Sequence, residues 1–111
     1  MPAPLGDLDE LVLLTVGILY PDAYAYAIKE KIHAETGHRP ALPTIHTALY
    51  RLEERGMLRS EMGGATAERG GRRKRLFRIT NAGLAALREV RATRNTLWDL
   101  LQGLQPSGGT P

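Results

Sequence analysis

The sequence predicts a mainly α (α+β) protein: a winged helix-turn-helix with a two-stranded β-hairpin wing and a long C-terminal helix. Two observations carry this prediction. Residues 42–80 have the pattern of an amphipathic helix, a strand, a glycine-flanked basic tip and a second strand. In the ten positions 69–78, six side chains are Lys or Arg. A helix with a polar outer face next to a basic hairpin suits the grooves and charge of duplex DNA.

The composition indicates one domain and excludes several kinds of site. The chain has 111 residues, 42% of them hydrophobic and 5% aromatic, enough for one mainly aliphatic core. It has no cysteine, which excludes disulfides, thiolate nucleophiles and cysteine-ligated zinc. The first residues lack a basic signal-peptide region, and the apolar run 11–20 is too short to cross a bilayer. We therefore expect a cytoplasmic protein without a membrane partner.

Positive charge is concentrated in the middle of the chain. The net charge is +3, but residues 41–78 hold nine Lys/Arg and four Glu, a local balance of +5. Residues 1–40 hold three Lys/Arg and six Asp/Glu, a local balance of −3. Such a localised excess is expected where a protein binds a polyanion. The alternative is a solvated basic loop, but few such loops lie between two strand patterns directly after a helix.

The spacing of apolar residues predicts two helices before the recognition helix. The first spans about 8–19 and has almost no polar face. In so small a domain this suggests that a second subunit covers one side, with Leu11 and Leu14 in the interface. The second helix spans about 23–36 and follows an N-cap at Asp22.

The third helix, about 43–56, is the expected recognition helix, because one face is apolar and the opposite face is polar. Arg51 on the polar face is the best candidate for a bidentate contact with guanine. An intrahelical salt bridge with Glu54 is an equally weighted alternative. A threonine near the helix start can bind a phosphate or act only in the cap. The candidate DNA contacts of this helix are Thr44, His46, Thr47, Tyr50 and Arg51.

Strands are expected at about 57–62 and 74–79, on either side of the basic tip. Arginines on a glycine-rich loop can follow the phosphate backbone or enter a narrow minor groove. Because side chains alternate along a strand, only about half of those at 73–78 can face DNA together. The favoured contacts are Arg72, Arg73 and Arg75, with Arg69 as a loop contact and Lys74 and Arg78 ranked below them.

A fourth helix is expected from a cap at Thr80-Asn81 to about 104. Its seam residues are three or four positions apart, a short heptad repeat that suits a dimer arm. The alternative is that this helix packs back on its own domain. The expected interface residues are Leu87, Val90, Arg94, Leu97, Trp98, Leu101 and Leu104. The expected organisation is a winged-helix domain at 1–80, a dimerisation helix at 81–104 and a flexible tail at 105–111.

The remaining signals favour binding over catalysis. His33, His38 and His46 do not have the spacing of metal ligands. There is no Ser/His/Asp set, paired-carboxylate site or phosphate-binding loop. Trp98 could line a cavity for a flat aromatic ligand, although packing is favoured for a large aromatic at helical spacing. We therefore expect no enzyme activity, no metal and no cofactor.

Four stretches of the chain, 5–14, 22–28, 49–58 and 70–83, resemble the short form of the PadR family of bacterial transcriptional regulators. The last stretch is the most specific, because the Arg/Lys wing, the strand and the Thr-x-Ala-Gly helix start occur together. The resemblance implies a homodimer, held by its first and last helices, that represses by binding an inverted repeat in double-stranded DNA. In some members a phenolic or drug-like effector releases the DNA.

The resemblance also adds two residues to the expected DNA contacts. Tyr24 and Tyr26 match an aromatic pair that helps to place the second helix near phosphates, and core packing is their alternative role. The competing interpretation of the whole chain is a winged-helix module that binds protein or RNA without a specific DNA site. A ligand-responsive protein without DNA activity is a third possibility.

Overall fold

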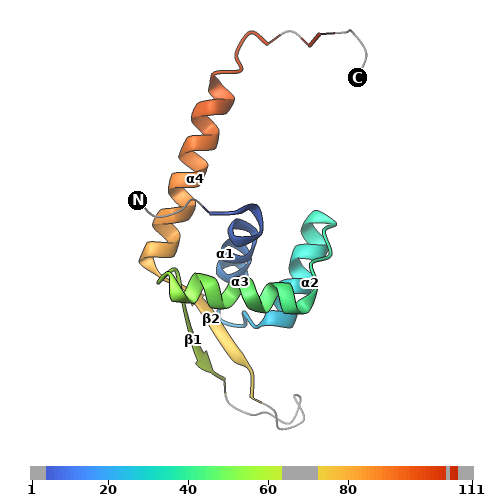
Figure 1. Ribbon diagram of the computed structural model, residues 1–111, viewed down its shortest axis with the longest axis vertical. Helices are drawn as coiled ribbons and strands as arrows, with labels where there is room; N and C mark the ends of the chain where they lie inside the picture. The colour runs from blue at the N-terminus through green and yellow to red at the C-terminus, as the bar shows by residue number, and fades with distance from the viewer. Residues whose placement is uncertain (1–4, 64–72, 105, 108–111) are drawn as a thin grey trace.

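The computed structural model describes residues 5–63, 73–104 and 106–107 and confirms the predicted fold class. Three helices pack together, and the hairpin and the last helix leave this bundle in opposite directions (Figure 1). No helix in these ranges is long and apolar enough to span a membrane. The elements are α1 Asp7–Leu19, α2 Ala25–Thr36, α3 Leu42–Glu54, β1 Leu58–Met62, β2 Arg75–Ile79 and α4 Asn81–Asp99.

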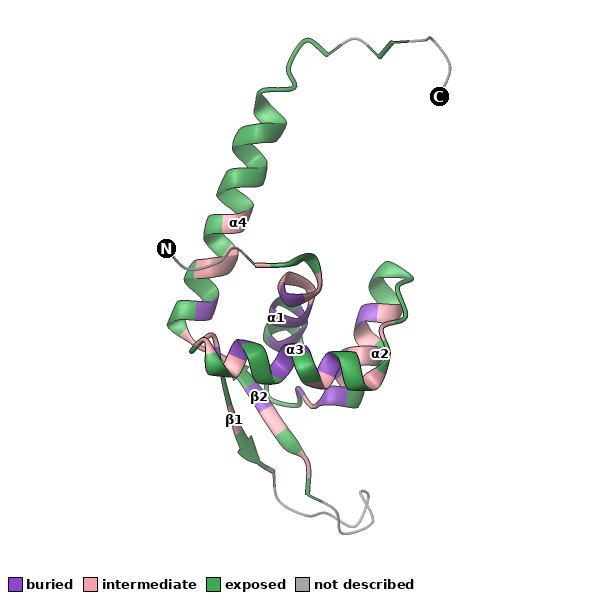
Figure 2. Ribbon diagram, viewed as in Figure 1, coloured by how far each residue is buried: buried purple, intermediate pink, exposed green. Residues whose placement is uncertain are grey.

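The core lies between α1, α2 and α3, where Figure 2 shows the buried residues gathered. Two strand residues, Leu58 and Phe77, are also buried and join this cluster from the hairpin. The apolar face predicted for the third helix is confirmed as buried. The helical residues with no exposed surface are Val12, Leu13, Val16, Ile28, Ile45, Ala48, Leu49 and Leu52.

α1 has one uncovered apolar side. Its inner face is fully buried, but Leu14 is 43% exposed and Ile18 is 62% exposed. Gly17 is exposed beside them. We call Leu14, Gly17 and Ile18 the α1 strip. Among the described residues of one chain, nothing covers this strip. An uncovered apolar side on α1 is compatible with the second subunit that the sequence predicts.

α2 starts two residues later than predicted, and its N-cap is Tyr24, not Asp22. The reason is a tertiary hydrogen bond. The carbonyl of Ala23 accepts the backbone N–H of Phe77 in β2 at 2.8 Å. This bond holds Ala23 against β2 and outside the helix, and the first helical bond runs from the N–H of Ile28 to the carbonyl of Tyr24.

The wing is an antiparallel hairpin whose base is bonded to the helical bundle. Leu58 lies opposite Ile79 at the base, and Met62 lies opposite Arg75 toward the tip. The Phe77–Ala23 bond joins β2 to the segment between α1 and α2. The direction of the wing is therefore set by the same packing that orients the helices.

α4 begins at the predicted cap. The Thr80 hydroxyl oxygen accepts the N–H of Gly83 at 3.1 Å. The same hydroxyl donates to the carbonyl of Gly56 at 2.7 Å, which ties the start of α4 to the turn after α3. The Thr80 side chain therefore starts α4 and joins it to the turn that follows α3.

α4 ends at Asp99, five residues before the predicted end at Leu104. Every described residue from 91 to 104 is exposed, so no burial against the domain supports a continued helix. The chain passes instead into turns in which an N–H bonds to the carbonyl three residues before it, and Gly103 has a positive φ of 82°. The predicted tail lies largely outside the described residues, and the predicted domain boundary at residue 80 stays a prediction.

Gly83 is required where α4 crosses the turn between α3 and β1. A Cβ at this position would overlap the carbonyl oxygen of Met57 and would lie 2.8 Å from Cγ1 of Ile79. The position itself is buried. Neither obstacle is the free end of a flexible side chain, so relief requires a shift of backbone.

We expect Gly83→Ala to lower the free energy of unfolding by about 1–3 kcal/mol, the usual cost of overpacking a rigid site. Urea unfolding followed by circular dichroism measures this change. Ala85→Ser, at an exposed site in the same helix, is the control and should stay within about 0.5 kcal/mol of the parent. A Gly83→Ala protein as stable as the parent would contradict the close approach of α4.

Candidate nucleic-acid interface

The N-terminal end of α2, the outer face of α3 and the first residues of β2 converge on a surface recess of about 200 Å³. This recess contains cationic, aromatic and imidazole groups from three separate stretches of the chain. We call it the wing-base recess. The predicted DNA contacts that line it are Tyr24, Tyr26, His46, Tyr50, Lys74 and Arg75.

A cation–π contact fixes one side of the wing-base recess. The ammonium Nζ of Lys74 lies 3.8 Å from the centroid of the Tyr24 ring. Both residues are half-buried. Such a contact stabilises by roughly 0.5–1 kcal/mol at an exposed site and more when water is excluded. The contact places Lys74, which the strand pattern ranked below the other wing cations, against the start of α2.

The opposite side of the recess presents aromatic rings to solvent. His46 and Tyr50 stack with their ring centroids 6.0 Å apart, and Tyr50 is half exposed. The Tyr26 hydroxyl donates to the Glu30 carboxylate at 2.8 Å, and this hydrogen bond raises the pKa of the Tyr26 phenol. Tyr26 therefore remains a neutral phenol, able to accept or share a hydrogen bond, at any physiological pH.

Arg75, the first residue of β2, is held by a short chain of hydrogen bonds. Its guanidinium donates to the Ser60 hydroxyl at 2.9 Å, and that hydroxyl donates to Glu53 at 2.6 Å. Ser60 and Arg75 lie on the same face of the hairpin as Phe77, because opposite residues in the register share a face. Arg75 is exposed beyond this contact, so its remaining N–H groups point to solvent.

The threonines of α3 lie on its solvent face. Thr44 and Thr47 are exposed one turn apart. The Thr47 hydroxyl donates to the carbonyl of Pro43 at 3.0 Å, so its proton is used within the helix and its lone pairs stay free. The N-cap residue of α3 is Ala41, and no side chain makes a capping hydrogen bond at this helix start. A cap role for Thr44 is therefore wrong.

Arg51 has a partner that no spacing rule predicts. Its Nε donates to Oδ2 of Asp9 at 3.0 Å, and its Nη2 lies 2.5 Å from Oδ1, a bidentate pair between α3 and α1. The Asp9 side chain is only 7% exposed, while that of Arg51 is 47% exposed. The hydrogen bond to Asp9 also raises the pKa of Arg51. The predicted alternative, a salt bridge between Arg51 and Glu54, is wrong, because the partner of Arg51 is Asp9.

The Asp9–Arg51 pair competes with the predicted guanine contact. Removing one partner of a buried ion pair costs about 3–5 kcal/mol, and less here because Arg51 is partly solvated. A bidentate base contact gains roughly 1–3 kcal/mol. Transfer of the guanidinium from Asp9 to a base is therefore not favoured by these magnitudes.

Two of the predicted wing contacts, Arg69 and Arg72, lie outside the described residues. Arg73 is exposed at the start of the returning segment. The other side of the hairpin carries a basic pair: Arg78, which the sequence pattern ranked low, lies opposite Arg59, which it did not single out. Like charges directly opposite each other are unfavourable in a sheet unless solvent or an anion separates them.

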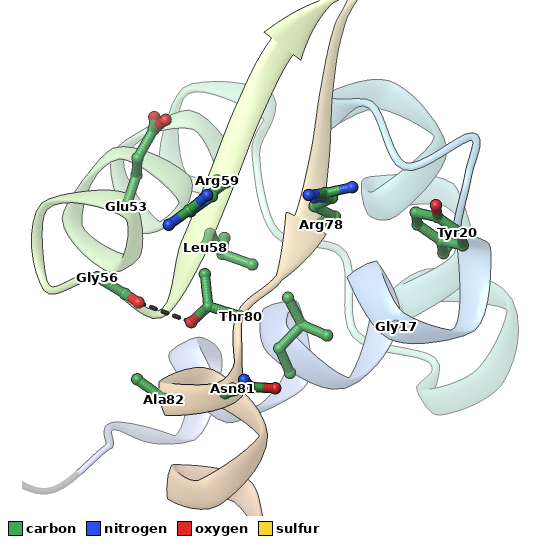
Figure 3. Close-up of a pocket in the computed structure, with 11 residues that line it drawn as sticks. Gly17, Tyr20, Glu53, Gly56, Leu58, Arg59, Arg78, Thr80, Asn81 and Ala82 are labelled. Carbon is green, nitrogen blue, oxygen red and sulfur yellow. Dashed lines mark hydrogen bonds between the residues drawn. The ribbon is translucent and has the colours of Figure 1, made fainter.

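This basic pair borders a hollow of about 1020 Å³ beside the base of the hairpin and the start of α4 (Figure 3). In Figure 3 Arg59 lies toward Glu53, and Arg78 lies toward Tyr20 of the segment after α1. Among the residues that line this hollow there is no nucleophile with a neighbouring base. Across the described ranges, no group of three His, Asp or Glu side chains could hold a metal ion.

The predicted dimer residues fall into two groups. Leu11, Leu87 and Val90 are half-buried within the chain, whereas the apolar residues farther along α4 are exposed. Leu101 and Leu104 lie beyond the end of α4, which shortens the predicted seam. The exposed predicted residues are Leu14, Leu97, Trp98, Leu101 and Leu104.

Arg94, in the middle of the predicted seam, has partners in its own chain. Its Nη2 lies 3.1 Å from Oε1 of Glu10 and 3.6 Å from Oδ1 of Asp7. The sequence pattern did not anticipate these contacts, which join α4 to the first turn of α1. At 60% exposure of its side chain, Arg94 contributes little to stability through them.

Comparison with protein families adds a decisive observation. The model of the transcriptional regulator PadR-like family matches residues 12–89, a range that includes the recognition helix, both strands and the first half of α4. The chain belongs to the PadR-like family. The resemblance of its wing and helix start to this family is thereby confirmed. No curated protein matches the PadR-like chain.

Solved structures similar to this PadR-like chain cover most of its length. A PadR family transcriptional regulator from Eggerthella lenta is 31% identical with a TM-score of 0.65, covering 87% of this chain and 88% of that chain. A PadR family regulator from Clostridium difficile is 20% identical with a TM-score of 0.71 (86% and 95% covered). A PadR-like regulator from Bacillus cereus is 20% identical with a TM-score of 0.67 (86% and 92% covered).

The family sets the general activity of the chain. PadR regulators bind DNA and regulate transcription, and the family and its structural neighbours are regulators, not enzymes. The wing-base recess, with its aromatic rings and cations beside the recognition helix, is the described surface that best fits this activity.

Proposed function

We propose that this PadR-like regulator is a homodimeric repressor that binds an inverted-repeat operator in double-stranded DNA. One observation carries the proposal: the wing-base recess brings α2, α3 and the wing to one exposed surface. Cations there attract phosphates, and the exposed face of α3 has the dimensions to enter a major groove. A repressor acts by occupying such a site, so no further activity is required.

We assign the groups of this surface by their position. The exposed Thr44, Thr47 and Tyr50 of α3 face the major groove, where they can contact phosphates or base edges. Tyr24 and Tyr26, with His46, bind phosphates beside the start of α2. The wing residues Arg73, Lys74 and Arg75, with Arg69 and Arg72 at the tip, bind the adjacent backbone or minor groove.

The dimer proposal is supported by apolar surface that one chain leaves uncovered. The α1 strip and the exposed Leu97 and Trp98 of α4 would each be expected to lie in an interface. Two subunits related by a two-fold axis would present two wing-base recesses, and such symmetry matches an inverted repeat.

Removal of the wing cations should weaken DNA binding in a salt-dependent way. A plot of log affinity against log salt has a negative slope, and each lost phosphate contact should decrease its magnitude by about 0.9. The triple variant Arg72→Gln/Arg73→Gln/Arg75→Gln should therefore decrease the magnitude of the slope by about 2–3. Fluorescence anisotropy with duplexes from the upstream region of the gene, at several salt concentrations, measures both affinity and slope. Arg88→Gln/Arg91→Gln, at exposed sites on α4, is the matched control.

Preference of the parent protein for one duplex over a scrambled duplex, retained at high salt, would support sequence-specific regulation. Equal binding to both duplexes, lost as salt rises, would favour the alternative of a module for protein or RNA. Normal binding by the triple variant would show that the wing is not the contact.

The α1 strip and α4 should hold the dimer together. A carboxylate introduced into a closely packed apolar interface is unpaired and poorly solvated, so Leu14→Glu or Leu97→Glu should give monomers. Light scattering after size exclusion measures the mass. Ala92→Glu adds the same charge on the other side of α4 and should leave the mass unchanged. If both interface variants keep the parent mass, the proposed interface is wrong.

We also propose that a small aromatic effector binds beside Trp98 and releases the DNA. The support is a hollow of about 290 Å³ next to this exposed ring, lined by Trp98, Asp99, Leu101, Gln102 and Leu104. Trp98 is the single tryptophan, so titration of a phenolic compound should quench its fluorescence and lower operator affinity together. Quenching without loss of affinity would contradict an effector role.

A further inference from the structure

The first turn of α1 carries three carboxylates with different surroundings. Asp7 is almost fully exposed, with 97% of its side chain accessible. Asp9 is buried under α3 and makes the bidentate pair with Arg51. Glu10 faces α4 and pairs with Arg94. Only Asp9 therefore connects this turn to the recognition helix.

The Asp9–Arg51 pair restrains the rotation of α3 about its own axis, because it ties one side of this helix to α1. Two parallel N–H···O contacts define a plane, so they restrict orientation more than one contact between point charges does. Asp9 has no alternative partner among the described residues, and a buried unpaired carboxylate is costly. The pair therefore adds a directional restraint on the rotation of α3 to the restraint that its buried apolar side chains already provide.

Rotation of α3 matters because the exposed face of this helix lies beside Arg51. Thr47 precedes Arg51 by one turn, and Tyr50 is its neighbour on the chain. At 100° per residue, a small roll of the helix moves these side chains relative to base edges. Base-edge contacts require a defined orientation, whereas attraction to phosphates is tolerant of small displacements.

We propose that Asp9 is a positioning residue for DNA recognition: it holds Arg51 inward and thereby sets the orientation of the recognition helix, and Arg51 is not the base-reading residue. This inference rests on the proposed DNA-binding function. It differs from a stability role because it concerns selectivity between duplexes. It also assigns base reading to the other exposed residues of α3.

The substitution Asp9→Asn separates the two roles of Arg51 by the sign of its effect. If Asp9 positions α3, the variant should lose about tenfold or more in affinity for the selected duplex and little for a scrambled one. If Arg51 instead binds DNA after leaving Asp9, release of the guanidinium should tighten binding. Asp7→Asn removes the same charge from the same turn and should change neither affinity, which makes it the control.

The salt dependence of Arg51→Gln binding gives a second, independent criterion. A positioning residue contributes no phosphate contact, so the slope of log affinity against log salt should equal that of the parent while selectivity falls. A decrease of about 0.9 in the magnitude of this slope would identify a direct contact between Arg51 and a phosphate and would overturn the inference. Unchanged affinity for the selected duplex in Asp9→Asn would overturn it as well.

Hydrogen exchange of the DNA-free protein tests positioning without any duplex. In Asp9→Asn, the backbone amides of 42–54 should exchange roughly tenfold faster, with those of 25–36 unchanged. Equal acceleration in both helices would mean that Asp9 only stabilises the fold, which contradicts the inference. If the parent protein selects no duplex, the proposed function fails, and the exchange result still decides whether Asp9 orients α3.

Discussion

The packing of Phe77 and Leu58 against the three-helix core is the constraint on which the rest of the structure depends. These residues belong to the wing, yet they are as buried as the core of the helices. The Phe77–Ala23 backbone bond reinforces the same junction. A wing attached only by its two ends could adopt many directions, and ordering it on DNA would cost conformational entropy. Because its base is part of the core, the described part of the wing stands in a fixed relation to α3 before any nucleic acid binds.

The polar contacts around this core differ in how much they contribute to folding stability. Arg94 and its carboxylate partners are solvated, so they contribute little to folding. Asp9 is not solvated, and its pairing with Arg51 is obligatory once α1 and α3 have packed. Lys74 lies between these cases, since an aromatic face replaces water on one side of its ammonium. Some of the cations beside α3 are thus paired within the protein itself, and those that stay solvated are the ones that could bind a further partner.

Local pattern predicted the elements of this fold better than their ends, and it predicted the kind of site better than its contacts. Ile28, Ile45 and Leu49 follow helical spacing, so their burial could be read directly. The start of α2 could not, because the carbonyl of Ala23 is taken by a strand that lies far along the chain. Asp9 and Arg51 are 42 positions apart, and no periodicity relates them. The basic tip and polar helix face indicated a nucleic-acid surface, but the partner of each cation depends on tertiary packing, which spacing does not encode.

α1 and α4 both leave apolar surface uncovered within one chain. α4 is anchored at one end by Thr80 and Gly83, and its second half extends from the domain with exposed Leu97 and Trp98. A helix supported by so few contacts in its own chain owes its length to local propensity, and it gains stability when an apolar partner covers it. The α1 strip offers a surface of the same character close to the anchored end. Association of two chains would therefore order α4 and fix the separation of two recognition helices at once, so that assembly and operator spacing are two consequences of one interface.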